Sequence, residues 1–201
     1  MKLYFSPGAC SLSPHIALHE AGLAHDTERV DLRAKKTASG GDFLAVNPKG
    51  QVPAFVLDNG ALLTEGPAIV QYIADQAPNS GLAPANGTIE RYRLQEWLNF
   101  ITTELHKGFS PLFKPTTPEN YKPIVRETLD ARFALVDREL AGKEWLTGSK
   151  FTVADGYLYV MTRWADAMKI DYSGLKNLVA WRARVLARPG VQAALKAEGL
   201  T

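Results

Sequence analysis

The stretch Ser6-Pro7-Gly8-Ala9-Cys10-Ser11-Leu12-Ser13-Pro14-His15-Ile16-Ala17-Leu18 decides how the N-terminal half of this chain folds. It follows the short apolar run Met1–Phe5, which predicts a buried strand, and it passes through a Pro/Gly turn into a helix expected over Pro14–Glu20. This order places Cys10 where the turn enters the helix. The N–H groups and the dipole of a helix start favour an anion, so a thiol at that position is biased toward its thiolate.

Cys10 is the only cysteine in the 201 residues, so it forms no disulfide within the chain. Ser13 stands where a dithiol redox motif would carry its second cysteine. Two interpretations of Cys10 remain open from its position alone. It is either a reactive thiol or a small buried apolar residue, since free cysteine is among the most buried residue types.

The composition is that of an ordinary globular protein, with 46% hydrophobic and 22% charged residues. The 23 basic and 21 acidic residues give a net charge of +2, which argues against a nucleic-acid partner held by phosphate contacts. No apolar run approaches the roughly 18 residues of a membrane span, and the first apolar run breaks too early for a secretory signal. We therefore expect a cytoplasmic protein without a membrane partner, which fits a single unpaired thiol.

The first 80 residues predict an α/β domain with the order βαβ followed by ββα. The turn Asp58-Asn59-Gly60 between two β-rich runs is a strong hairpin signal, and Gly66-Pro67 opens a helix with proline where it is best tolerated. The segment 33–42 is polar and expected to be mobile. The expected elements after the first helix are a strand at 28–32, a helix at 43–46, strands at 52–57 and 61–64, and a helix at 68–74.

A Pro/Gly/Asn-rich segment at 77–87 marks a linker, so we expect one domain over residues 1–80 and a second over 87–201. The second domain is helical by periodicity, because apolar residues recur every three or four positions around 94–105 and 124–140. Thr152 and Asp155 have the spacing of a capping box at the start of a buried helix over 153–168.

Three features of the first domain suit one kind of ligand. A cis Val52-Pro53 bond would turn the Val52 backbone toward an extended peptide, whereas a trans bond would be an ordinary strand start. Glu65 at a helix N-terminus could hold an amine beside amides that hold a carboxylate, or it could serve only the helix dipole. Lys35 could pair with a second carboxylate or remain solvated. Together with Cys10, these residues describe a short peptide with two carboxylates, one amine and a thiol.

In the second domain a polar stripe contains the only histidine beyond residue 25. A solvated helix face is one interpretation of the stripe, and the other is that His106, which titrates near neutrality, stabilises a thiolate. The other three histidines have no cysteine or carboxylate cluster beside them, so we expect surface histidines and no metal. The stripe is Asn99, Thr102, Thr103 and His106, and the other histidines are His15, His19 and His25.

An apolar substrate would need an apolar cleft between the domains, and aromatic residues of the second domain could line it. Phe113 and Trp164 are the candidates, with Phe109 and Met168 as further ones; the alternative is that these side chains belong to the core.

These motifs, in this order, resemble a cytosolic glutathione S-transferase. The resemblance covers essentially the whole chain, and the cysteine at position 10 resembles the bacterial beta class. It implies a thioredoxin-like N-terminal domain joined to an all-α C-terminal domain. The motifs are Pro7-Gly-Ala-Cys-Ser11, Asn47-Pro-Lys-Gly-Gln-Val-Pro-Ala54, Leu63-Thr-Glu65, Trp97-Leu-Asn-Phe100, Thr103-Glu-Leu-His-Lys107 and Phe151-Thr-Val-Ala-Asp155.

The resemblance also implies site roles. In the first domain Val52 with Pro53 pairs with the cysteinyl backbone of glutathione, Glu65 and Gly66 hold its γ-glutamyl end, and Lys35 holds its glycyl carboxylate. Cys10 lies beside the glutathione sulfur, and Ser11, rather than the core residue Tyr4, is the hydroxyl donor. Many relatives carry serine or aspartate where this chain has Gly66, which removes one hydroxyl from the head-group site. In the second domain His106 and Lys107 approach Cys10 of the same chain, while Asn99, Thr103 and Glu104 reach glutathione across a two-fold dimer interface.

The expected activity is transfer of glutathione, as co-substrate, to apolar electrophiles in detoxification by a homodimer. Two alternatives remain. One is a glutathione-dependent thiol reductase or reductive dehalogenase that works through a mixed disulfide at Cys10. The other is a module of the same fold that carries ligands or serves assembly without catalysis.

Overall fold

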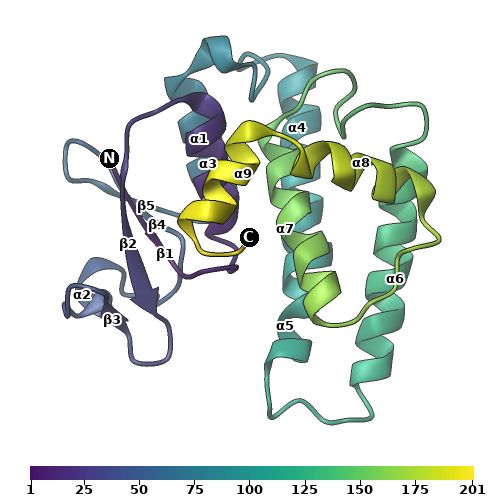
Figure 1. Cartoon of the computed structure of the whole chain (residues 1–201), viewed down its shortest axis with the longest axis horizontal. Coiled ribbons are helices and arrows are strands. Elements are labelled where there is room, and N and C mark those ends of the chain that lie inside the picture. Colours follow the sequence, from purple (N-terminus) through teal and green to yellow (C-terminus); the bar gives the residue numbers. More distant parts are fainter. The chain divides into compact units, whose positions relative to one another are not determined.

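The computed structural model describes all 201 residues, and they form two compact units. Unit 1 comprises residues 1–83 and 188–201, and unit 2 comprises residues 84–187 (Figure 1). The division at Ala83 falls inside the Pro/Gly-rich segment 77–87. Residues 188–201 were expected to belong to the second domain (87–201), but they are part of unit 1, because α9 (Pro189–Ala197) packs along α1 (Leu12–Ala21).

Unit 1 is built around a five-stranded mixed sheet with the order β3-β2-β1-β4-β5. The apolar run at the N-terminus forms the central strand, with Leu3 fully buried, as its hydrophobicity predicts. β1 pairs parallel with β2 and antiparallel with β4, so Tyr4 lies opposite both Glu28 and Ala54. The strands are β1 (Lys2–Phe5), β2 (Asp26–Asp31), β3 (Lys36–Thr37), β4 (Ala54–Val56) and β5 (Leu62–Thr64).

Helices complete unit 1 and confirm most of the expected elements. α1 ends at Gly22, whose φ of +66° is the left-handed conformation that glycine adopts without strain. The segment 33–42, expected to be polar and mobile, carries the short strand β3, where Thr37 is buried. The remaining helices of the unit are α2 (Phe43–Val46), α3 (Gly66–Gln76) and the 3₁₀ turn η1 (Pro78–Ser80).

Unit 2 is all helical. A long helical run begins with α4 (Ile89–Phe100), continues through the π-helical segment η2 (Ile101–His106) and ends with α5 (Lys107–Phe113). The π geometry shows in the Lys107 N–H, which donates to the carbonyl of Thr102 five residues earlier. The other helices are α6 (Lys122–Glu139), α7 (Val153–Ala167) and α8 (Lys176–Leu186). None of the helices in the chain has the length and apolar character of a membrane span.

The expected capping box at the start of α7 is present. The Thr152 N–H donates to Asp155 Oδ2 over 2.9 Å, and the Asp155 carboxylate also accepts from the Leu146 N–H and the Trp181 indole. Asp155 is fully buried, and this burial raises the pKa of its carboxyl. Every residue from 153 to 162 is buried, so α7 is the core of unit 2.

Candidate active site

Cys10 lies one residue before the N-cap of α1 and is half-buried. Its thiol donates to the carbonyl of Val52, with Sγ 3.2 Å from the oxygen. The turn that leads into α1 therefore contacts the loop that precedes β4, although the two segments are about forty residues apart. The sequence predicted the position of Cys10 at the helix start but not its partner.

Ser11 is placed differently from the expected hydroxyl donor. Its side chain has no exposed surface, and its hydroxyl donates to the Ser6 carbonyl and accepts from the Ser6 N–H over 3.3 and 3.1 Å. The hydroxyl hydrogen is thus used inside the turn, and Ser11 fixes the backbone next to Cys10. Tyr4 packs against Phe43 in the core, as expected.

The Val52-Pro53 bond is cis, which decides between the two interpretations of this proline. The preceding loop is organised by the buried Asn47, whose side-chain amide donates to the Gln51 carbonyl over 2.7 Å. Lys35 reaches the same loop, and its ammonium donates to the Gly50 carbonyl over 2.7 Å. Lys35 is therefore held beside the Val52 loop, and Asn47 is a supporting residue to which the sequence analysis gave no role of its own.

Glu65 is exposed and precedes the first turn of α3, which no side chain caps. Its φ of +69° lies in the left-handed region, an unusual conformation for a residue with a side chain. Lys49 donates to Glu65 Oε1 over 2.6 Å and to the hydroxyl of Thr64 over 2.9 Å. Such strain at an uncapped helix start, beside Gly66, is typical of a functional position. Lys49 is a second residue that the sequence did not single out.

The C-terminal segment supports the Cys10 turn from the side of α9. Glu198 is buried, and its two carboxylate oxygens accept from the Gly8 N–H and contact His15 Nδ1, each over 2.9 Å. Nothing local in the sequence could pair Gly8 with a glutamate 190 positions later.

In unit 2, His106, which was expected to stabilise a thiolate, lies at the end of η2. Its Nδ1 is 2.5 Å from the hydroxyl of Tyr157, a buried residue of α7. The indole of Trp164 packs edge-on against the same imidazole, with ring centroids 4.9 Å apart. Tyr157 was not predicted as a site residue. Its position seven residues before Trp164 could have indicated it, because residues with this spacing lie on the same face of a helix.

The two predicted electrophile-binding residues lie together. The rings of Phe113 and Trp164 contact each other with centroids 5.0 Å apart, and Phe113 is 45% exposed. Phe109 packs on both rings but is fully buried, so it belongs to the core. His106, Trp164 and Phe113 therefore form one aromatic cluster that combines an imidazole with accessible apolar surface.

The residues expected to reach a partner subunit lie along the same helical run. Asn99, Thr103 and Lys107 are exposed, and the Thr103 hydroxyl donates to the Asn99 carbonyl over 3.1 Å. Glu104 accepts from Arg132 of α6 over 2.7 Å, so within this chain its carboxylate already has a cationic partner.

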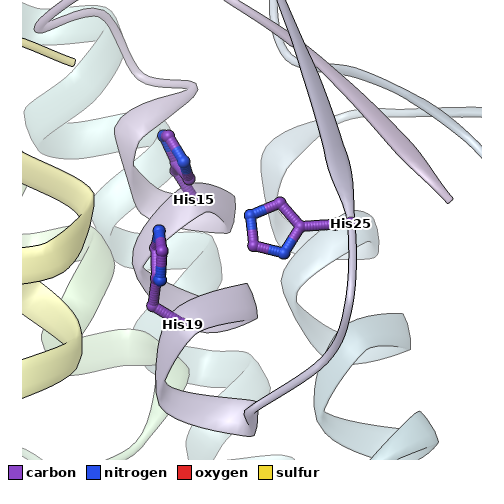
Figure 2. Close-up of side chains that lie close together, drawn as sticks. All are labelled: His15, His19 and His25. Carbon is purple, nitrogen blue, oxygen red and sulfur yellow. The ribbon is translucent and has the colours of Figure 1, made fainter. Parts of the chain in front are cut away.

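The expectation that His15, His19 and His25 lie on the surface is wrong for His15. His15 is buried, His19 and His25 are half-buried, and the three side chains lie together in unit 1 (Figure 2). The sequence could not show this, because His25 is brought to α1 by the turn between α1 and β2.

Comparison with known proteins identifies the chain. Residues 8–76 match the family model of the glutathione S-transferase N-terminal domain, and residues 100–189 match that of the C-terminal domain. The chain is 52% identical over 200 residues to glutathione S-transferase GstA of Escherichia coli O157:H7, and the match covers both chains completely.

Two solved structures agree over the full length of both chains. A sphingomonad glutathione S-transferase complexed with glutathione is 52% identical, with a TM-score of 0.96. The beta-class glutathione S-transferase of Sphingomonas chungbukensis is also 52% identical, with a TM-score of 0.97. With the thioredoxin-like sheet, the cis-proline and the helical second unit in place, this chain belongs to the glutathione S-transferase family, in its bacterial beta class.

Proposed function

We propose that this glutathione transferase joins the thiolate of reduced glutathione to apolar electrophilic substrates, as a cytoplasmic homodimer with a detoxifying role. The observation that carries the proposal is the contact between Cys10 Sγ and the Val52 carbonyl. It brings a thiol beside a cis-proline loop to which Lys35 is also held, and this is the combination that the sulfur and the glycyl end of glutathione require.

In unit 1 the proposed glutathione site consists of Cys10, Lys35, Val52, Pro53, Glu65 and Gly66. Glu65 supplies a carboxylate for the γ-glutamyl amine, and the Gly66 N–H at the uncapped start of α3 is the amide for its carboxylate. Pro67 has no N–H, and the N–H groups of Ala68 and Ile69 donate to the Glu65 carbonyl. Before glutathione binds, Lys35 donates to the Gly50 carbonyl and Lys49 to the Glu65 carboxylate. In this proposal Lys35 exchanges the carbonyl for the glycyl carboxylate of glutathione. Ser11 acts as a positioning residue for the Cys10 turn.

In unit 2 the proposed electrophile site is the aromatic cluster of His106, Trp164 and Phe113. Its apolar rings suit an aromatic or aliphatic substrate, and the imidazole can hold a hydrogen bond to sulfur. Asn99, Thr103, Glu104 and Lys107 complete the proposal as glutathione contacts, the first three from the partner subunit. Sedimentation of the purified protein tests the dimer. A monomer at assay concentration would mean that Asn99, Thr103 and Glu104 do not contact glutathione from a partner subunit.

The chemistry is a substitution. The glutathione thiol gives up its proton, its sulfur forms a bond to an electrophilic carbon, and the leaving group departs with the bonding electron pair. The residues of the chain hold the peptide, favour the thiolate by hydrogen bonds and helix-start amides, and keep water away from the apolar substrate. In this reaction Cys10 takes no covalent part, and its thiol donates to the Val52 carbonyl beside the proposed position of the glutathione sulfur.

A second candidate function uses Cys10 directly, as a glutathione-dependent reductase or reductive dehalogenase. It is favoured by the half-buried thiol at a helix start, where a mixed disulfide with glutathione could form. A carrier or assembly module without activity is the remaining alternative, and failure to bind immobilised glutathione would favour it.

The deciding experiment compares two assays on one preparation: conjugation of glutathione to an aromatic halide, and reduction of a glutathione mixed disulfide. Both are repeated with Cys10→Ala and with Ser13→Ala as the control from the same turn of α1. We expect conjugation by Cys10→Ala to stay within about tenfold of the unaltered enzyme, because Cys10 only supports the sulfur. Loss of all turnover in this variant, with Ser13→Ala unaffected, would favour the redox function.

A further inference from the structure

We propose that His15, His19 and His25, none of which is among the glutathione-binding residues proposed for unit 1, form a binding site for a divalent transition-metal ion, Zn²⁺ in the first instance. Imidazole is a preferred ligand of zinc, copper and nickel, and three histidines are a sufficient protein ligand set for an ion that keeps one position for water.

Two elements supply the ligands. His15 and His19 are four residues apart on α1, so they stand on the same face of the helix, while His25 faces them from the segment just before β2 (Figure 2). The imidazole centroids of His15 and His19 are 5.1 Å apart, and the His25 ring meets both edge-on at 5.7 and 5.2 Å. Each ring offers one nitrogen, and these three atoms lie within 4.8 Å of one another.

Two of the rings are oriented as metal-binding histidines usually are. His15 Nδ1 contacts the buried Glu198 carboxylate over 2.9 Å, and His25 Nδ1 contacts the Leu23 carbonyl over 2.7 Å. An acceptor beside Nδ1 keeps the hydrogen on that nitrogen and leaves the lone pair on Nε2. A carboxylate and a backbone carbonyl are the two commonest outer partners of histidine ligands.

The third ring has an unused nitrogen. His19 Nε2 is buried and has no hydrogen-bond partner. A buried polar atom without a partner costs free energy, and a bound ion would remove this cost.

Binding requires only a small adjustment of the rings. Nitrogens that share a tetrahedral ion at about 2.0–2.1 Å lie roughly 3.3 Å apart, so the present spacing must close by about 1.5 Å. The half-buried His25, which sits in the turn between α1 and β2, can supply most of this by rotation about its side-chain bonds. The bound ion would join α1 to the start of β2 and, through Glu198, to the end of α9.

Calorimetric titration with ZnCl₂ tests the site, using protein without an affinity tag that has been stripped with a chelator. We expect one Zn²⁺ per chain, and Co²⁺ in its place should give the visible absorption of a four-coordinate ion. His19→Gln and His25→Gln should each weaken Zn²⁺ binding at least about tenfold. Both lie at half-buried positions, so circular dichroism can verify that each variant is folded.

Cys10→Ser is the matched control, because a thiol is the other strong zinc ligand in the chain. It should bind Zn²⁺ as tightly as the unaltered protein. The proposal is overturned by the absence of a one-to-one titration, by unchanged affinity in His19→Gln and His25→Gln, or by loss of binding in Cys10→Ser. None of these results depends on transferase activity.

Discussion

Two kinds of helix start occur in this protein. The N-terminus of α7 is closed by its own side chains, since Thr152 and Asp155 cap each other and Asp155 also holds Leu146 and Trp181. At the starts of α1 and α3 no side chain caps the helix: Ser11 turns its hydroxyl back to Ser6, and Glu65 extends into solvent from a left-handed backbone. The cap of α7 uses its hydrogen bonds within the fold, whereas the start of α3 offers the Gly66 N–H and the exposed Glu65 carboxylate to a ligand.

The largest effect is expected from Asp155→Ala, which opens the closed helix start. The substitution leaves the Trp181 indole and the N–H groups of Thr152 and Leu146 without their acceptor in a fully buried site. We expect the free energy of unfolding to fall by at least about 3 kcal/mol, since each stranded donor costs about 1–3 kcal/mol. Urea unfolding followed by tryptophan fluorescence measures it.

Asp130→Asn, at an exposed position of α6, is the control for the loss of one carboxylate. It should change the free energy of unfolding by less than about 0.5 kcal/mol. A decrease of less than about 1 kcal/mol in the free energy of unfolding of Asp155→Ala would contradict the prediction. It would mean that the side-chain cap of α7 contributes little more to folding than the uncapped starts of α1 and α3.

Glu65→Gln tests the open start of α3. The exposed carboxylate makes little contribution to folding, but a charged hydrogen bond to the glutathione amine is worth about 1.5–3 kcal/mol. We therefore expect the KM for glutathione to rise about tenfold or more while the unfolding midpoint stays nearly constant. Glu96→Gln, which breaks an exposed ion pair with Arg93 on α4, should leave KM unchanged. An unaltered KM in Glu65→Gln would remove this residue from the glutathione site.

Ser11→Ala and Ser13→Ala compare two buried hydroxyls at the start of α1. Ser11 makes two hydrogen bonds to Ser6, whereas the Ser13 hydroxyl has no partner. We expect Ser11→Ala to cost about 1–2 kcal/mol in thermal or urea unfolding and Ser13→Ala to be neutral or slightly stabilising. Equal effects of the two substitutions would mean that the Cys10 turn does not depend on the Ser11 hydroxyl.

The smallest effect on stability is expected from the ion pair between Glu28 of β2 and Lys2 of β1, in the sheet of unit 1. The Lys2 ammonium, with Ser39, lowers the pKa of Glu28 to about 2 from its usual 4.5. A carboxyl with a lowered pKa in the folded state stabilises the fold above pH 4.5, and this contribution disappears as the pH falls toward 2.

Glu28→Gln should therefore be less stable than the unaltered protein at pH 7 by less than about 1 kcal/mol, and the gap should close on acidification. Urea unfolding at pH 7 and pH 3 measures it, with Glu119→Gln as the control for loss of an exposed paired carboxylate. A gap that widened at low pH would contradict the direction of this shift.

Much of the fold could be predicted from local patterns. The apolar run at residues 1–5, the hairpin turn at Gly60, the proline after Gly66 and the Thr152–Asp155 box each fix an element through interactions within a few residues. The helix at 43–46 has the predicted bounds. The π-helical segment before His106 was missed, because it shifts a helix by one residue without interrupting its apolar periodicity.

The candidate site was predictable where chemistry is local, at Cys10 and Glu65. It was not predictable where a residue works through a distant partner, as for Asn47, Lys49 and Tyr157. Ser11 shows the same limit, since a serine at a helix start suits a ligand or its own turn equally well, and only the position of Ser6 decides between them.

The order of elements, the helix start beside the single thiol and the family resemblance follow from neighbouring residues along the chain. Only the tertiary structure decided that Cys10 meets the Val52 carbonyl, that α9 packs on α1 with Glu198 beneath the Cys10 turn, and that three scattered histidines gather at one place. The first two contacts join residues at least forty positions apart, and His25 reaches α1 only through the turn before β2, so their partners are set by how α1, β2 and α9 pack.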